Sequence, residues 1–526
     1  MSMELNNIFY RPEWTCGRYN HDAHVAIYYN LIAGESHFFE DFSADVMGVF
    51  LSLQKNGHIG LKELSDITNI SEKSLAPFLF QLCKLGLITT YKPCKQDVTN
   101  YRKTLHRSYN NGMQPMRAKS SDGDYSIEKD DAEAAYESKV GGITSVMFEL
   151  TYNCSEKCIH CYNIGASRNE FEKNLRSGTP NLSFSDYVRI IDELHEEGIT
   201  KVLLTGGDPF SYTSIWQLIE YLFQKDIAVD LFTNGIALIG KEELLAGLYP
   251  HRVCLSLYSG IANDHDNITR VKGSWHKTIS VIEGLSSYSI PMVIKCCVMK
   301  PNLKSYYTTT HIGEKYGIPV QYELNVTDSI DGDKCVSRYL RLSVEQLEIV
   351  LRDPATVMYV GKDTENFGGV AINMDNNACK AGYHTFNITP DGNLVPCCAF
   401  HLIFGNLLKK SLKEIITGNT ILEGWRRLKV RDYEECGKHE YCAFCNLCAG
   451  INNSENGTPT KAAENNCYMA KTRYGLAYKM ELENYDPLQG LSLHEKLKRL
   501  PKEKIGIIRR TYTHDKCESS EKNVDK

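Results

Sequence analysis

The sequence predicts an α/β fold: an incomplete (β/α)6 barrel between a small N-terminal α+β module and a cysteine-rich C-terminal domain. Between residues 143 and 335, six apolar strand candidates alternate with helical segments, which is typical of parallel βα units. Cysteines also gather in two places. Three lie within residues 154–161, and seven more form motifs between residues 379 and 467. An incomplete barrel is favoured over an open sheet because the first cysteine group directly follows the first strand.

Length and composition limit which classes of protein this chain can belong to. A chain of 526 residues predicts two to four domains, and 42% hydrophobic with 24% charged residues is ordinary for a globular protein. A net charge of −6 gives no reason to expect a nucleic acid partner. The N-terminus lacks the pattern of a signal peptide, and no run of 18 apolar residues occurs. We therefore expect a cytoplasmic protein that does not act in a membrane.

Nineteen cysteines need an explanation. A disulfide framework is typical of small secreted domains, and this long chain has no export signal. Scattered buried thiols explain some of the cysteines, but not their clustering. Metal or cluster ligation is therefore the better interpretation of the grouped cysteines.

Residues 8–92 are predicted to form a winged-helix-like module, with short strands around a turn at Gly34 and two helices after them. In the second helix Pro77 is tolerable if the helix begins near Ser74. Residues 93–142 are polar and charged, which predicts a linker.

Residues 143–335 are expected to form the barrel. Its strand candidates are SVMFEL, KVLLT, AVDLFT, RVCLSLY, MVIKCCVM and VQYELNV. The first helix should be capped by Ser183, with Asp186 at its third position, and should end at Gly198. The remaining divisions are a bridging segment at 336–375, a cysteine-rich domain at 376–470 and a tail at 471–526.

The string LTYNCSEKCIHCYN places Cys154, Cys158 and Cys161 directly after the first strand. Loops at the carboxyl ends of parallel strands are where barrels carry their chemistry. Thiolates are the usual ligands of iron–sulfur clusters, and three of them leave one iron of a four-iron cluster without a protein ligand. S-adenosylmethionine (SAM) can take that iron through its amine and carboxylate. A zinc site with His160 as fourth ligand is the alternative, disfavoured because His160 adjoins Cys161.

This string resembles the motif of the radical SAM superfamily, whose aromatic position is taken here by His160, which is then expected near the adenine. The TGGDP string resembles the glycine-rich loop of that family, so Gly206, Gly207 and Asp208 are expected at the methionine end of SAM. By the same resemblance Ser256 is expected at the ribose and Arg270 at the SAM carboxylate, although an ordinary loop serine and a surface arginine remain the alternatives. A TNG string at 233–235 also fits the family, without an assigned role.

The resemblance implies reductive cleavage. A reduced [4Fe-4S] cluster passes one electron to SAM, which yields methionine and a 5′-deoxyadenosyl radical that abstracts a hydrogen atom. The electron would come from a donor such as flavodoxin or ferredoxin.

The C-terminal cysteines resemble the SPASM extension of radical SAM enzymes. Twelve residues separate Cys379 from Gly392, and four more precede Cys397. The later gaps of five, two and two residues depart in order from the family pattern. The resemblance implies two auxiliary [4Fe-4S] clusters. The first would be held by Cys379, Cys397 and Cys448, and the second by Cys436, Cys442, Cys445 and Cys467.

Two questions stay open for this domain. The first ligand set lacks a fourth protein ligand, for which Cys398 is a candidate if the register is shifted. A zinc ribbon is the structural alternative. The cysteines outside the motifs are interpreted as structural, although Cys335 near the barrel mouth could donate a hydrogen atom.

The N-terminal module is similar to the small peptide-binding chaperone of pyrroloquinoline quinone biosynthesis, which adds a leader peptide as a strand to its sheet. The leading hypothesis is therefore a radical SAM/SPASM peptide maturase that crosslinks or epimerises a ribosomally made precursor. A sulfatase maturase is the second hypothesis, weakened because Cys398 stands where those enzymes carry an aspartate. A non-enzymatic iron–sulfur regulator is the third.

Overall fold

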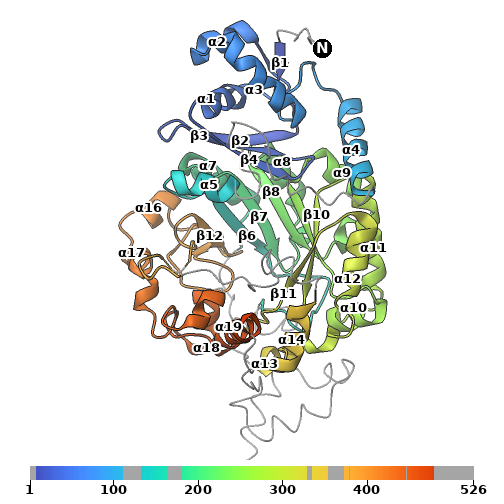
Figure 1. The fold of residues 1–526 in the computed structure, drawn as a ribbon, viewed down its shortest axis with the longest axis vertical. Coiled ribbons are helices and arrows are strands. Elements are labelled where there is room, and N and C mark those ends of the chain that lie inside the picture. Colours follow the sequence, from blue (N-terminus) through green and yellow to red (C-terminus); the bar gives the residue numbers. More distant parts are fainter. Residues whose placement is uncertain are drawn as a thin grey trace, which may run out of the picture.

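In the computed structural model the described residues form three sheets, and Figure 1 shows them stacked along the long axis of the molecule. The described residues are 8–110, 132–163, 181–328, 335–353, 372–377, 379–445 and 447–478. Most of the predicted tail, part of the predicted linker and much of the bridging segment lie outside them.

The N-terminal module contains two of the sheets. Strands β1 (Ile8–Tyr10) and β5 (His58–Gly60) form an antiparallel pair, while β2 (Thr15–Asn20), β3 (Val25–Asn30) and β4 (Glu35–Glu40) form an antiparallel sheet with β3 in the centre. Its helices are α1 (Asp41–Ser52), α2 (Leu61–Thr68) and α3 (Glu72–Lys84). Phe39 of the sheet packs against Phe50 and Phe78 of the helices in one buried cluster. Helix α3 is capped by Ser71, earlier than predicted, so that Pro77 lies inside it.

The predicted linker carries two helices, α4 (Lys95–Asn110) and α5 (Ala132–Lys139). Tyr136 of α5 is buried with Ile27 and Phe38 on the second face of the three-stranded sheet. Both faces of that sheet are therefore covered by helices or by the barrel.

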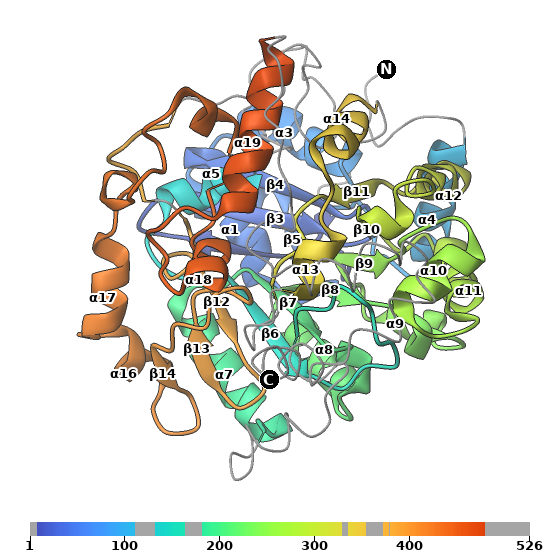
Figure 2. The same ribbon diagram turned by 90° about the horizontal axis from the view of Figure 1, so that it is seen from below.

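The barrel consists of six parallel strands in sequence order: β6 (Ser145–Thr151), β7 (Lys201–Gly206), β8 (Ala228–Thr233), β9 (Arg252–Ser256), β10 (Met292–Cys297) and β11 (Val320–Glu323). Around them lie α7 (Phe184–Glu197), α8 (Ile215–Gln224), α9 (Glu242–Gly247), α10 (Ala262–Thr269), α11 (Ser274–Ser287) and α12 (Thr308–Tyr316), with short helices η1 (Pro209–Ser211), η2 (Ile236–Leu238) and η3 (Lys300–Asn302) (Figures 1 and 2). Helix α7 has the predicted capping box of Ser183 and Asp186 and ends at Gly198. The predicted fold class is confirmed.

The C-terminal part begins with α13 (Cys335–Leu340) and α14 (Val344–Arg352). It continues with β12 (Thr385–Ile388), β13 (Asn393–Val395), β14 (Gly405–Asn406), α16 (Leu412–Ile416), α17 (Thr420–Arg427), η4 (Val430–Asp432), η5 (Glu440–Phe444), α18 (Ala449–Asn456) and α19 (Glu464–Ala477). Strand β12 lies parallel to β6, with Phe386 opposite Val146. One sheet therefore runs in the order β11-β10-β9-β8-β7-β6-β12-β13-β14 through barrel and C-terminal domain.

The N-terminal module rests on the end of the barrel where the strands begin. Tyr29 Oη lies 3.3 Å from Thr200 Oγ1, next to the start of β7, and Tyr249 donates to Glu13 at 2.6 Å just ahead of β9. Arg11 forms an ion pair of 2.7 Å with Asp226, two residues before β8. The loops that follow these strands, where the cysteine motif lies, are at the opposite end. Within the described ranges no helix has the length and apolar character needed to cross a membrane.

Candidate functional site

The predicted cysteine motif forms a loop at the carboxyl end of β6. Backbone bonds to the end of α10 fix it: Lys157 N donates to Thr269 O at 2.9 Å, and Ile159 N donates to Ile268 O at 3.0 Å. The thiols of Cys154, Cys158 and Cys161 lie within electrostatic reach of one another.

Burial governs the protonation of these thiols. It raises the pKa of the Cys154 thiol to about 12 and the pKa of Cys158 well above the ordinary value. The bare chain therefore holds neutral thiols, and thiolates at this place require a cationic partner. A set of three converging thiols is suited to an iron–sulfur cluster with one open iron.

The glycine pair is explained by the close approach of two loops. Gly207 N donates to Thr151 O at 2.6 Å, and the backbone of Gly206 has φ +132°. A Cβ atom on Gly206 would lie 2.2 Å from Thr151 O, and one on Gly207 would lie 2.5 Å from Tyr152 O. Only glycine fits at both positions. The predicted glycine-rich loop therefore lies directly against the chain that leads into Cys154.

Asp208 is 1% exposed and lies within electrostatic reach of Cys154. Its carboxylate accepts bonds from Thr233 Oγ1 at 2.7 Å, from Asn234 N at 3.1 Å and from Phe210 N at 3.0 Å. The described contacts of Asp208 join the loops after β7 and β8, so this side chain positions neighbouring backbone.

Asn234 is a site residue that sequence reasoning missed. Its amide donates to Cys154 Sγ at 3.5 Å and to Ser155 Oγ at 3.1 Å. The TNG string was the signal, because it directly follows the third strand at the same sheet edge.

The remaining predicted SAM contacts surround the same loop. The ring of His160 meets the ring of Tyr258 edge-on, with centroids 4.7 Å apart, and burial lowers the pKa of His160 to about 4. Tyr258 Oη lies 3.9 Å from Cys158 Sγ and also bonds with the Ser256 side chain. Arg270 ends α10 in a left-handed conformation, directly after the residue that binds the cysteine loop. His160 and Ser256 therefore both contact Tyr258, whose hydroxyl lies near Cys158, and Arg270 follows the residue that binds the cysteine loop.

In the C-terminal domain, Cys397 lies within electrostatic reach of Cys379 and Cys448. Cys379 Sγ accepts a bond from Ala381 N at 3.3 Å, and Cys448 caps the start of α18. Gly392, with φ +83°, makes the turn between β12 and β13 that brings Cys379 and Cys397 to the same end of the hairpin. These are the three residues predicted for the first auxiliary cluster.

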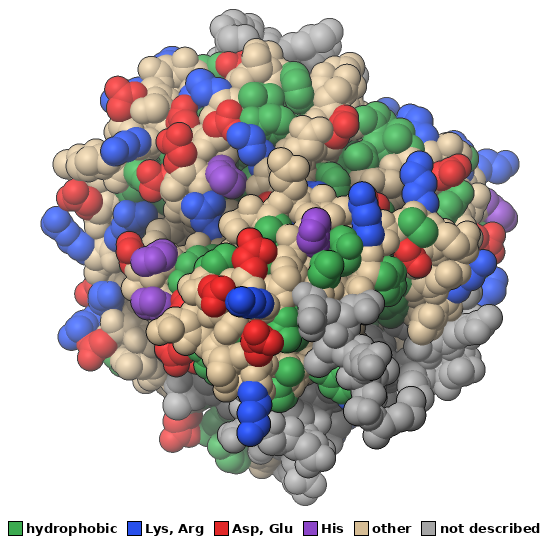
Figure 3. Space-filling view, turned by 90° about the horizontal axis from the view of Figure 1, so that it is seen from above, with side chains coloured by type: hydrophobic (Ala, Val, Ile, Leu, Met, Phe, Trp, Pro, Cys, Tyr) green, Lys and Arg blue, Asp and Glu red, His purple; other side chains and the backbone are tan. Residues whose placement is uncertain are grey.

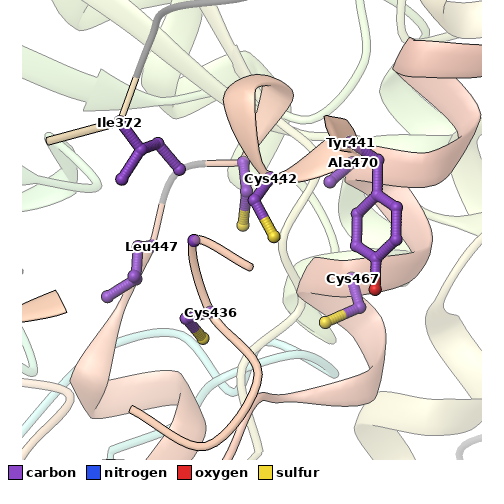
Figure 4. A pocket seen from close by; sticks show the side chains of 9 residues that line it. Ile372, Cys436, Tyr441, Cys442, Leu447, Cys467 and Ala470 are labelled. Atoms are coloured by element: carbon purple, nitrogen blue, oxygen red, sulfur yellow. The ribbon is translucent and has the colours of Figure 1, made fainter. Parts of the chain in front are cut away.

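The thiols predicted for the second auxiliary cluster share one cavity. Cys436, Cys442, Cys445 and Cys467 line one pocket, and Figure 4 shows sulfur atoms of this set pointing into it. Across the parts of the chain that the structure describes, no group of three or more His, Cys, Asp or Glu side chains is placed to hold a single metal ion. Four thiols around one pocket are a ligand set suited to an iron–sulfur cluster.

Cys398 belongs to a different environment from its neighbour Cys397. Its thiol bonds with the hydroxyl of Tyr162, beside Cys161, and lies within reach of Glu149. Glu149 is 1% exposed and accepts a bond from Tyr152 Oη at 2.8 Å. Cys398 therefore lies between the first cysteine loop and the first auxiliary set. Cys335 begins α13, and its side chain lies outside the description.

The two cysteine regions each match a known domain family. Residues 148–305 match the radical SAM superfamily, and residues 379–449 match SPASM, an iron–sulfur cluster-binding domain. Radical SAM domains bind SAM at a [4Fe-4S] cluster, and SPASM domains hold auxiliary clusters, so these are the cofactors of the chain.

Relatives share the same core. The AdoMet-dependent heme synthase of Methanosarcina barkeri is 24% identical over 58% of this chain and 90% of its own length. The subtilosin biosynthesis protein AlbA of Bacillus subtilis is 26% identical over 58% of this chain and 66% of its own length.

A solved structure covers more of the chain. SuiB of Streptococcus suis bound to the precursor peptide SuiA has a TM-score of 0.53 at 14% identity, and the match spans 87% of this chain and 99% of that one. Fold and domain matches agree with the arrangement of the cysteines. The chain is therefore an enzyme with a radical SAM domain at residues 148–305 and a SPASM domain at residues 379–449.

Proposed function

We propose that this enzyme cleaves SAM at a cluster bound by Cys154, Cys158 and Cys161 and modifies a ribosomally made precursor peptide. The observation that carries the proposal is the convergence of these three thiols with the glycine-rich loop at one barrel end. When bound and reduced, the cluster supplies the electron that converts SAM into methionine and a 5′-deoxyadenosyl radical.

The surrounding residues then have distinct roles. Gly206 and Gly207 let the loop backbone approach the methionine end of SAM, and Asp208 holds that loop against Asn234. His160 and Tyr258, whose rings meet edge-on, shield Cys158 from water. Ser256 and Arg270 are proposed to contact the ribose and carboxylate of SAM.

The C-terminal cysteines are proposed to hold two auxiliary clusters. Cys379, Cys397 and Cys448 bind the first, and Cys436, Cys442, Cys445 and Cys467 bind the second. The shared cavity of the second set supports four protein ligands there. Because the Cys398 thiol is engaged with Tyr162, it is not proposed as the fourth ligand of the first cluster.

A polypeptide substrate is supported by the N-terminal module. Strand β4 is an edge of its sheet, and the described backbone offers no further strand along that edge. Beyond β4, Phe42 is 41% exposed and meets Phe78 of α3, whose neighbour Phe80 is 40% exposed. On the face seen in Figure 3, hydrophobic side chains lie between scattered acidic and basic ones. We infer that a leader peptide adds to β4 and places apolar residues against α3.

The relatives favour the same class of substrate. SuiB binds a precursor peptide, and its fold match spans 87% of this chain, whereas the heme synthase matches 58%. AlbA belongs to subtilosin biosynthesis. Whether the enzyme forms a crosslink or epimerises a residue must be determined by analysing the product.

SAM cleavage is tested with the anaerobically reconstituted and reduced full-length enzyme. The expected product is 5′-deoxyadenosine, detected by chromatography. The triple variant Cys154→Ala/Cys158→Ala/Cys161→Ala should give none, while a control with Cys83, Cys94 and Cys254 changed to alanine should retain it. Continued formation of 5′-deoxyadenosine by the triple variant would contradict the proposed cluster site.

The peptide substrate is tested by co-expressing the enzyme with each short peptide encoded beside its gene. Mass spectrometry then reads the product: loss of two hydrogens indicates a crosslink, and deuterium uptake at constant composition indicates epimerisation. The double variant Phe42→Ser/Phe80→Ser should weaken precursor binding without changing SAM cleavage. Leu244→Ser is the matched control, because Leu244 lies in α9 of the barrel and is 51% exposed. Equal precursor affinity in both variants removes the leader-binding proposal.

A further inference from the structure

Tyr433 lies between the two cysteine sets of the SPASM domain. The residue follows η4, and its side chain is 1% exposed. Its hydroxyl is within electrostatic reach of Cys379 and Cys448 of the first set and of Cys436 of the second. Burial, reinforced by these thiols, raises the pKa of the phenol. A phenol is protonated at neutral pH and can therefore donate a hydrogen bond.

The hydroxyl of Tyr433 has no hydrogen-bond partner among the described residues. A buried hydroxyl without a partner destabilises a folded chain, so such groups normally find one. Sulfur atoms converge around this hydroxyl, and sulfur bound to iron is a better acceptor than a neutral thiol because it carries negative charge. We therefore expect a cluster sulfur to accept the hydrogen bond of the Tyr433 hydroxyl once the cluster is bound.

We propose that Tyr433 donates a hydrogen bond to a sulfur atom of the first auxiliary cluster and thereby sets its reduction potential. This inference rests on the proposed ligation by Cys379, Cys397 and Cys448. A reduced cluster carries one more negative charge, so a donor to its sulfur stabilises the reduced form and raises the potential. Tyr433 contacts the cluster and tunes its potential, and it takes no direct part in the reaction at SAM.

The test compares two tyrosine-to-phenylalanine variants of the full-length protein. Tyr187 is the matched control: it is 0% exposed, its hydroxyl also lacks a partner among the described residues, and it packs in α7 against Phe148 and Tyr212. Both variants are made in the background with Cys154, Cys158 and Cys161 changed to alanine, which leaves the auxiliary clusters as the paramagnetic centres. Potentials are measured by redox titration followed with electron paramagnetic resonance.

Tyr433→Phe should shift one auxiliary midpoint potential to a more negative value, and Tyr187→Phe should shift neither. The reduced parent should also show an exchangeable-proton coupling that Tyr433→Phe lacks. Unchanged potentials in Tyr433→Phe overturn the inference. Absence of auxiliary iron from the parent instead overturns the proposed clusters themselves, so the two failures are distinguishable.

Stability of the iron-free protein provides a second measurement. Because the hydroxyl has no described protein partner, Tyr433→Phe should leave the apo-protein Tm unchanged or raised. Loss of iron in this variant with an unchanged apo Tm supports the inference, since the hydroxyl then matters only when the cluster is present. A lowered apo Tm reveals a protein partner for the hydroxyl and overturns it.

Discussion

The side-chain amide of Asn234 donates to Cys154 Sγ across 3.5 Å and ties the loop after β8 to the cysteine loop after β6. Once Cys154 binds iron, this bond places a donor beside a negatively charged sulfur. Hydrogen bonds to charged groups contribute roughly 1.5–3 kcal/mol. Asn234 therefore joins the candidate site although it holds neither iron nor SAM.

Asn234→Ala should lower the potential of the SAM-binding cluster and slow 5′-deoxyadenosine formation by about tenfold or more. Redox titration and a timed chromatographic assay measure the two effects. Thr278→Val is the control, because Thr278 donates to the Asn234 carbonyl at 3.2 Å and does not contact sulfur in the described structure. The interpretation fails if both variants behave alike.

Gly206→Ala should dislodge the cysteine loop, because its new Cβ would lie 2.2 Å from Thr151 O. We expect a cost of about 2–5 kcal/mol from overpacking and positive φ together, with iron lost at the first cluster. Gly240→Ala separates the two causes, since Gly240 also has positive φ but nothing lies within 4 Å of the added Cβ. Its cost should stay near 1–2 kcal/mol. Iron content and apparent Tm measure the difference, and equal losses would contradict the close-approach argument.

The pair of Asp230 and His251, with Oδ1 and Nδ1 2.7 Å apart, predicts a pH-dependent stability beneath the N-terminal module. Burial alone would raise the pKa of Asp230, but attraction by His251 and Lys201 outweighs it and lowers the pKa to about 2. A carboxyl with a depressed pKa stabilises the fold above its unfolded pKa of about 3.9, and this stabilisation is lost as pH falls toward 2.

Asp230→Asn should therefore destabilise the iron-free protein by about 2 kcal/mol between pH 5 and 7, with the gap from the parent narrowing below about pH 4. Thermal unfolding across this range checks it. Asp22→Asn, at an exposed turn, should follow the parent at every pH. A gap for Asp230→Asn that does not change with pH would contradict the ion-pair explanation.

The position of the N-terminal module predicts a minimum spacer in the precursor. The module contacts the barrel where strands begin, and the cysteine loop lies where they end. Strand β6 has seven residues, which corresponds to about 23 Å. An extended peptide needs about seven residues to cover that height. Removing about that many residues between the leader and the modified position should abolish modification while leaving precursor affinity unchanged. Mass spectrometry measures modification and calorimetry measures precursor affinity. Modification of the shortened precursor would contradict the proposed path of the peptide from the N-terminal module to the cysteine loop.

The barrel strands and the cysteine sets could be predicted because their signals are local. Each strand is a short apolar run, and the two ends of α7 are marked in the sequence by the capping residues Ser183 and Gly198. The spacing of Cys154, Cys158 and Cys161 lies within one loop. Likewise, Cys436, Cys442 and Cys445 are close in sequence, and the structure brings Cys467 to the same cavity.

The features that were missed depend on contacts between distant segments. The pairing of β12 with β6 joins residues that are about 240 positions apart. The sequence of β12 contains no local signal that predicts which strand it pairs with. Asn234 gains its role only when three strands align their carboxyl ends. Pro77 lies inside α3 because Ser71 caps the helix and buried packing by Phe78 and Leu79 supports it, which outweighs the local penalty of proline.

The sheet that runs through both domains gives the barrel one margin paired with a strand of the C-terminal domain and one margin without a paired strand among the described residues. At one margin, β6 is hydrogen-bonded to β12. A movement of β6 would therefore also move the hairpin that carries the first auxiliary cysteines. At the other margin β11 is a four-residue strand that ends the sheet, with Gln321 and Glu323 exposed. The segment after β11 is nonetheless joined to the C-terminal domain, because Asn465 donates to Asn325 at 3.3 Å and Arg341 pairs with Glu455 at 2.8 Å. Both margins of the barrel sheet are therefore held by the domain that carries the C-terminal cysteines.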